Sequence, residues 1–169
     1  MRGTSGLMNT PIIELRQSEQ RVAAALAEHG LPGSVIVLDQ LATTAQMAAD
    51  ALGIEVGRIV KSLVFAGAET TTPYMLLVSG ANRVHERRVS RLIGEKLVRS
   101  DADFVRDITG FAIGGVSPLG HLKQMSLWID EDLFAFQTVW AAAGNARSVF
   151  EIKPQDLARA TGAKRINVT

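Results

Sequence analysis

The chain has 169 residues, of which 47% are hydrophobic and 21% are charged, and its formal net charge is +1. This length and composition are typical of one globular domain with a buried core, and they exclude wholesale disorder. Cysteine is absent, which excludes disulfides and thiolate nucleophiles, and the three scattered histidines predict no metal centre.

The N-terminus, residues 1–10, lacks the apolar stretch of a signal peptide and is predicted to be a flexible tail. No apolar run approaches the roughly 20 residues that cross a bilayer. No repeat, low-complexity tract or linker interrupts residues 11–169, so we expect one domain there. Together these features predict a cytoplasmic protein with no membrane partner.

The first predicted element is a helix that ends at Gly30, followed by a short β-branched strand over residues 34–38. Either Thr43 or Thr44 is expected to cap a second helix, which ends at Gly53. The start of the domain is therefore predicted to run helix, strand, helix.

The middle of the chain predicts an antiparallel hairpin, with strands over residues 59–65 and 74–78 joined by a polar turn. A helix follows over residues 84–93. Three of its apolar side chains are expected to face the core: Val89, Leu92 and Ile93.

The last third of the chain contains two more predicted helices. Asp101 is expected to cap one that ends at Gly110, and Pro154 lies in the first turn of another that ends at Gly162. Four further strands are expected over residues 111–113, 127–129, 138–141 and 148–153. Several strands are joined too tightly for parallel crossovers, so the predicted fold class is α/β, a mixed, largely antiparallel sheet with packed helices.

Lys61 interrupts the apolar strand predicted over residues 59–65. Side chains alternate along a strand, so Lys61 is expected among apolar neighbours on both faces. An ammonium group in such a place loses hydration and needs a partner, a cleft or a bound anion. Position alone leaves two interpretations open: a functional lysine, or one near the strand's start whose side chain reaches water.

Two glycine-containing segments are candidates for binding a ligand through the backbone. The first is Gly114-Gly115-Val116-Ser117-Pro118, and the second begins with Gly144 and Asn145. The first is neither a phosphate-binding P-loop nor a G-x-S-x-G nucleophile elbow, since it lacks the residues that complete those motifs. From the residues alone, an ordinary turn between strands remains the alternative for each segment.

Three arginines repeat every four residues on the helix predicted after the hairpin: Arg83, Arg87 and Arg91. Such a stripe suits nucleic-acid phosphates, although a solvated helix face has the same pattern. The near-zero net charge gives no general signature of nucleic-acid binding, and no DNA partner is expected.

Taken together, three blocks resemble the YbaK/EbsC family, which is related to the editing domain inserted in bacterial prolyl-tRNA synthetases. The blocks are residues 57–65 around Lys61, residues 114–118, and Gly144 before residues 149–152. Their order and spacing match, and the resemblance covers residues 18–165.

The resemblance implies a hydrolase that deacylates mischarged aminoacyl-tRNA, mainly prolyl tRNA carrying a small wrong amino acid such as alanine or cysteine. It implies that Lys61 is catalytic, and that the segment from Gly114 to Pro118 holds the aminoacyl end. A prolyl-tRNA synthetase is an implied candidate partner, and no cofactor or metal is implied. Arg83, Arg87 and Arg91 are then expected as tRNA phosphate contacts.

One departure from the family bears on the substrate. The synthetase editing domains carry a pocket histidine shortly after the late glycine, whereas here Asn145, Ala146 and Arg147 follow Gly144. The amino acid that is removed therefore stays open, with Asn145 as a candidate pocket contact. Two other functions remain: a non-catalytic tRNA-binding or regulatory module of the same fold, and an esterase for small activated acyl compounds.

Overall fold

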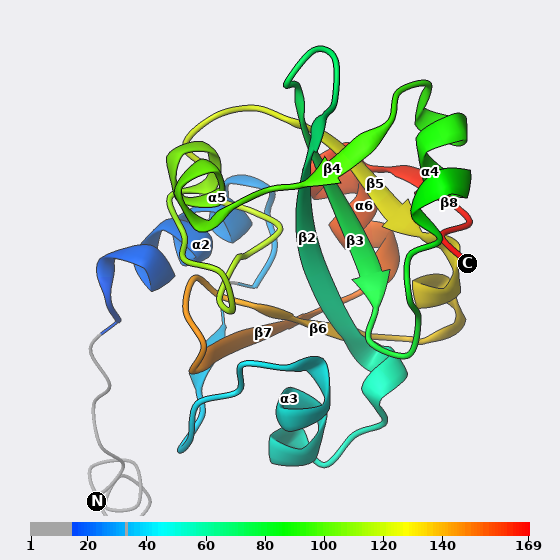
Figure 1. Ribbon diagram of the computed structural model, residues 1–169. Helices are drawn as coiled ribbons and strands as arrows, with labels where there is room; N and C mark the ends of the chain where they lie inside the picture. Colours follow the sequence, from blue (N-terminus) through cyan, green and yellow to red (C-terminus); the bar gives the residue numbers. More distant parts are fainter. Residues whose placement is uncertain (1–14, 33) are drawn as a thin grey trace, which may run out of the picture.

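The computed structural model describes residues 15–32 and 34–169, so the tail predicted over residues 1–10 lies outside the described residues (Figure 1). The helices are α2 (Gln17–Glu28), α3 (Ala45–Leu52), α4 (Glu86–Ile93), α5 (Ala102–Thr109) and α6 (Pro154–Thr161), with short 3-10 helices η1 (Val56–Arg58) and η2 (Glu131–Ala135). The strands are β1 (Val35–Val37), β2 (Ile59–Gly67), β3 (Pro73–Ser79), β4 (Leu97–Arg99), β5 (Ser126–Asp130), β6 (Val139–Ala142), β7 (Ser148–Ile152) and β8 (Lys164–Ile166). Within the described part of the chain, no helix is long and apolar enough to span a membrane.

The strands form one mixed sheet in the order β1-β7-β6-β2-β3-β5-β8, with β4 paired to β2 off this path. The pairs β1–β7, β6–β7, β2–β3 and β2–β4 are antiparallel. The pairs β2–β6, β3–β5 and β5–β8 are parallel. The predicted class, an α/β fold with a largely antiparallel mixed sheet, is confirmed.

The hairpin of β2 and β3 lies at the centre of the sheet, with α4 and α5 on opposite sides of it (Figure 1). Neighbouring strand residues point to opposite faces, and both faces of the hairpin are covered by other parts of the chain. Leu76 and Leu77 are each fully buried, but they belong to two different hydrophobic clusters. Burying each such side chain contributes about 1.5–3 kcal/mol, which makes this hairpin the structural centre of the domain.

The predicted helix ends are confirmed where a specific cap encodes them. Thr44 precedes α3 and its hydroxyl accepts a hydrogen bond from the Met47 amide at 3.1 Å. Asp101 precedes α5 and accepts from the Phe104 amide at 2.8 Å. Gly53 ends α3 in the left-handed conformation, where a side chain would be strained.

The strand predicted over residues 111–113 is wrong. This segment turns away from the sheet after α5, so that Phe111 is buried whereas Ile113 is 61% exposed. The amide of Gly115 donates to the Ala112 carbonyl at 3.1 Å, a turn in place of an inter-strand bond. An apolar segment such as this favours a strand, but here its residues are divided between the core and the exposed surface of one loop.

The helix after the hairpin also differs from the prediction. It begins at Glu86, so Arg83 precedes it and does not lie on its surface. Val89 and Ile93, four residues apart, pack against the sheet, whereas Leu92 falls outside this stripe and is 53% exposed. The inward position predicted for Leu92 is therefore wrong.

Candidate active site

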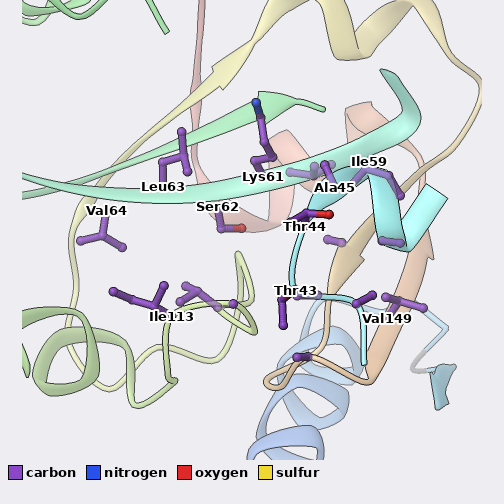
Figure 2. A pocket seen from close by; sticks show the side chains of 18 of the residues that line it. Thr43, Thr44, Ala45, Ile59, Lys61, Ser62, Leu63, Val64, Ile113 and Val149 are labelled. Atoms are coloured by element: carbon purple, nitrogen blue, oxygen red, sulfur yellow. The ribbon is translucent and has the colours of Figure 1, made fainter. Parts of the chain in front are cut away.

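A cavity of about 450 Å³ lies along β2 (Figure 2). Its walls come from the start of α3, the loop after α5 and the segment that joins β6 to β7. These three segments are far apart in the sequence, and the middle of β2 is the element that they share. The geometry of β2 therefore decides what the cavity offers to a ligand.

One edge of β2 is paired with β3 over residues 60–66. At the two ends of this ladder, the Gly67 amide donates to Thr72 at 2.9 Å and the Gly80 amide donates to Ile59 at 2.7 Å. Hydrogen-bonded pairs in an antiparallel ladder recur every second residue. Odd-numbered residues of β2 therefore bond to β3, and even-numbered residues direct their N–H and C=O groups to the opposite edge.

The opposite edge of β2 is interrupted. The ladder with β6 ends where Val60 pairs with Ala141, and the ladder with β4 begins where Phe65 pairs with Arg99. Ser62 lies between these two ladders, and its backbone groups point to this edge. The cavity opens beside the gap, since residues 59–65 all contribute to its lining.

The side chain of Lys61 lies on one face of β2, and the part of the cavity that Ser62 and Val64 line lies on the opposite face. In Figure 2 its side chain points the same way as Leu63, whereas Ser62 and Val64 point the opposite way. The Lys61 ammonium donates a hydrogen bond to the backbone carbonyl of Asn82 at 2.5 Å. A ligand that contacts both Lys61 and the opposite face of β2 must therefore cross the interrupted edge.

The environment of Lys61 lowers its pKa below the ordinary lysine value. Burial is the main cause, because it disfavours the charged form, and the positive charges of Arg83 and Arg99 act in the same direction. The carboxylate of Asp130 opposes them. The charged groups that act on Lys61 are therefore two arginines and one carboxylate.

Asp130 fixes the loop that holds Lys61. This carboxylate is 1% exposed, and it accepts hydrogen bonds from the Ser79 amide at 3.0 Å and from the Asn82 side chain at 2.8 Å. The same Asn82 offers its carbonyl to Lys61. The position of the ammonium therefore depends on a buried network at the end of β3.

The predicted glycine segment is divided between the cavity and the core behind it. Gly114, which has a φ of 99°, and Val116 line the cavity. Gly115 is packed so closely that an added Cβ would lie 2.2 Å from the Cα of Asn145. Ser117 and Pro118 are buried behind the loop and do not line the cavity.

Ser117 and His121 support the loop and do not form a nucleophile–base pair. The Ser117 hydroxyl accepts from the Leu119 amide at 3.1 Å, and the imidazole Nε2 of His121 donates to the Ser117 carbonyl at 2.7 Å. Burial is the main cause that lowers the pKa of His121, so the neutral imidazole is favoured. A serine hydrolase arrangement is therefore excluded here.

Asn145 lines the cavity, but its amide is already bonded within the protein. Its nitrogen donates to Glu19 at 2.8 Å, and its oxygen accepts from the Arg147 amide at 2.9 Å. Glu19 is 3% exposed and also accepts from the Ser148 hydroxyl. No local pattern in the sequence indicates this role of Glu19, because 126 residues separate it from Asn145.

Gly144 joins this segment to the N-terminal helix. It has a φ of 106°, and an added Cβ would lie 2.9 Å from the backbone of Ser18. With the Glu19 contacts, the first turn of α2 therefore supports the wall of the cavity that faces β2.

The three predicted phosphate contacts occupy two places. Arg83 acts on the pKa of Lys61, while Arg87 and Arg91 line an open groove along α4. Arg99 connects the two regions, because it lines the cavity and forms an ion pair with Glu86 at 3.2 Å. The cavity and the groove along α4 thus meet at the Arg99–Glu86 pair.

A model of the aminoacyl-tRNA editing domain family matches residues 39–160. The uncharacterised protein YwhH of Bacillus subtilis is 31% identical over 121 residues, which are 72% of this chain and 76% of that protein. A candidate Cys-tRNA(Pro)/Cys-tRNA(Cys) deacylase of Enterococcus faecalis, EbsC, is 28% identical over 129 residues, 75% of this chain and 77% of that protein.

Solved structures show the same likeness over more of the chain. The crystal structure of a candidate trans-editing enzyme for prolyl tRNA synthetase has a TM-score of 0.86 and 42% sequence identity. The match covers 92% of this chain and 99% of that one.

Proposed function

Because the chain belongs to the aminoacyl-tRNA editing domain family, we propose that it hydrolyses the ester bond of mischarged aminoacyl-tRNA. The observation that carries this proposal is the interrupted edge of β2, where Lys61 lies on one side and the loop of Gly114 and Val116 on the other. Residues 11–169 act in this proposal as one domain, and the protein works in the cytoplasm without a membrane, DNA or a cofactor.

The reaction needs positioning more than it needs a protein nucleophile. An aminoacyl ester is already activated, so water adds to its carbonyl carbon, the carbon–oxygen bond to the ribose breaks, and the ribose oxygen leaves with a proton. The enzyme holds the ester and water together and stabilises the charge that develops on the carbonyl oxygen. The backbone at Gly114 and Val116 holds the aminoacyl group, and the missing side chain of Gly114 allows a close approach.

Lys61 binds the phosphate of the terminal nucleotide in this proposal. Its ammonium, together with the nearby charges of Arg83 and Arg99, offers the cationic environment that a phosphate requires. The substrate then crosses the interrupted edge, with its phosphate beside Lys61 and its aminoacyl group beside the glycine loop. Arg87 and Arg91 lie in the groove along α4, which the Arg99–Glu86 pair joins to the cavity, and contact other tRNA phosphates in this proposal.

We assign prolyl tRNA carrying alanine or cysteine as the preferred substrate, with prolyl-tRNA synthetase as the enzyme that produces it. The names of two relatives support the proline tRNA and the cysteine: a candidate Cys-tRNA(Pro)/Cys-tRNA(Cys) deacylase and a candidate trans-editing enzyme for prolyl tRNA synthetase. Alanine is what the resemblance to the family implies. Asn145 contributes to the wall of the amino-acid pocket through its position, since Glu19 and Arg147 engage its amide.

The test is deacylation of alanyl-, cysteinyl- and seryl-tRNA for proline, with correctly charged prolyl-tRNA as a control, by the wild type and by Lys61→Ala. Lys123→Ala removes an exposed lysine outside the cavity and is the matched control. Loss of a charge-assisted hydrogen bond, about 1.5–3 kcal/mol, predicts a decrease of about 10- to 150-fold in kcat/KM for Lys61→Ala alone. Full activity of Lys61→Ala would overturn its role, and tRNA binding without any hydrolysis would favour a non-catalytic module.

A further inference from the structure

The glycine loop, residues 110–120, is held at both of its ends by one side chain of α2. The guanidinium of Arg21 donates to the Thr109 carbonyl at 2.8 Å, where α5 ends. It also donates to the Gly120 carbonyl, at 3.2 Å from Nε and 3.1 Å from Nη2. Because a guanidinium carries five donors in a rigid planar fork, one arginine bonds to both carbonyls at once. Arg21 thus ties together the two ends of the loop.

Arg21 also reaches the middle of the loop through two aromatic rings. Its guanidinium carbon lies 4.5 Å from the centre of the Phe111 ring, which is almost completely buried. The imidazole of His121 lies edge-on to the same ring, with 6.3 Å between the ring centres. That imidazole donates to the Ser117 carbonyl at 2.7 Å. The contacts of one arginine therefore extend from the ends of the loop to its interior.

Two glycines make room for this contact. Gly110 has a φ of 79°, and a Cβ added there would lie 2.4 Å from Nη2 of Arg21. Gly120 has a φ of 82°, and its added Cβ would lie 3.2 Å from the Arg21 carbonyl oxygen. Both positions therefore need a residue without a side chain, for the backbone conformation and for the close approach of α2.

The loop that Arg21 holds borders the cavity, whereas Arg21 itself is outside the lining. Gly114 lines the cavity, and its neighbour Gly115 is packed against the backbone of Asn145. Lys61, on β2, is held by the separate hydrogen-bond network at the end of β3. The two groups assigned to the substrate's two ends are therefore fixed by different parts of the chain.

We propose that Arg21 is a positioning residue for the deacylation: it fixes the glycine loop, and with it the aminoacyl group, relative to Lys61. The proposal rests on the function assigned above, because that function places the aminoacyl group beside the loop. Displacement of a reacting group by about 1 Å can reduce the rate about 100-fold, even when the residue that changes lies away from the chemistry. Arg21 acts in this way through the loop and does not touch the substrate.

The proposal predicts different effects on kcat and KM. Arg21→Ala is expected to lower kcat for cysteinyl-tRNA of the proline tRNA about 10- to 100-fold. The value of KM should change by less than about 3-fold, because the phosphate contacts through Lys61 remain. Arg21→Lys keeps the charge but replaces the fork by a single ammonium, so it should restore only part of kcat. Arg106→Ala, at an exposed arginine of α5 outside the cavity, is the matched control.

A second measurement follows the loop itself and needs no substrate. The Gly115 amide donates to the Ala112 carbonyl at 3.1 Å, and the Leu119 amide donates to the Ser117 hydroxyl at 3.1 Å. In Arg21→Ala both amides are expected to exchange with solvent faster than in the wild type, while amides in β2 keep their rates. Unchanged exchange at both amides would show that Arg21 does not hold the loop.

The outcomes distinguish the two proposals. If the wild type hydrolyses none of the mischarged tRNAs, the deacylase function fails, and the part of Arg21 in it fails as well. If the wild type is active and Arg21→Ala keeps its kcat well below the thermal midpoint of unfolding, Arg21 only stabilises the fold and the deacylase function stands. If Arg21→Ala does not fold, Arg21→Lys decides: wild-type kcat and wild-type exchange in the loop would overturn the positioning role.

Discussion

The two edges of β2 are made from the same residues and serve different purposes. Toward β3 the strand is paired without interruption over residues 60–66, and the side chains around this hairpin are among the most deeply buried in the domain. Toward β6 and β4 the pairing stops at Val60 and resumes at Phe65, and the cavity lies beside the gap. One strand therefore supports the fold through one edge and leaves the other edge open to a ligand.

Two of the four buried side-chain polar atoms without a partner in the described part of the chain lie beside the interrupted edge. Along the paired edge, the N–H and C=O groups of β2 that point to β3 have partners there, as the backbone of a central strand requires. Along the interrupted edge, the hydroxyls of Ser62 and Ser100 have no partner among the described residues. Natural sequences tolerate such local costs mainly at functional sites.

The largest expected effect is a loss of stability on the paired edge. Leu76 pairs with Leu63 across the hairpin and is completely buried, so Leu76→Ala removes apolar surface and leaves a cavity. We expect the free energy of unfolding to fall by about 2–5 kcal/mol, measured by urea denaturation. Ser62→Ala, one residue from Leu63 but on the interrupted edge, is the contrasting variant. Equal destabilisation by both would break the distinction between the two edges.

A smaller effect is expected where α2 supports the wall opposite β2. Glu19→Ala leaves the Asn145 amide and the Ser148 hydroxyl without their acceptor, a penalty of about 1–3 kcal/mol in unfolding free energy. Because the wall then moves relative to the ester, we also expect kcat/KM for alanyl-tRNA to decrease, with Glu19→Gln restoring much of it. A Glu19→Ala enzyme with unchanged kcat/KM would show that this wall does not position the substrate.

The smallest expected effect is on the pH dependence of stability near the glycine loop. The pKa of buried His121 is lowered, so below the ordinary value of about 6.5 the unfolded state takes up protons that the folded state does not. Stability therefore rises as pH increases through this window and is lost as pH falls. His121→Gln should weaken this dependence, which unfolding curves of the wild type and the variant between pH 5 and pH 8 would show. The same pH dependence in both proteins would contradict the prediction.

The parts of the fold that the sequence predicts well are those with a local physical signal. The caps Thr44 and Asp101 lie within three residues of the amides that they bind, so a short pattern contains the whole interaction. The alternation of residues 59–65 likewise predicts Lys61 in a largely buried strand, and the motif around Lys61 is local enough to carry the resemblance to a family.

The parts that the sequence does not predict depend on distant partners. Strands β4 and β8 are three residues long, and a pattern of that length does not distinguish a strand from a loop. Glu19 acts on a segment 126 residues away, and the gap in β2 exists only because β6 and β4 pair with different parts of it. Such features follow from topology, and no local pattern contains them.

The most direct test of this account is amide hydrogen exchange along β2, with and without a non-hydrolysable proline tRNA that carries alanine through an amide bond. In the free protein the Ser62 amide, on the interrupted edge, is predicted to exchange faster than the Lys61 and Leu63 amides that bond to β3. Adding the tRNA analogue should slow Ser62 and leave its two neighbours unchanged. A Ser62 amide already protected in the free protein, or one that the analogue does not slow, would contradict the assignment of the interrupted edge as the binding site.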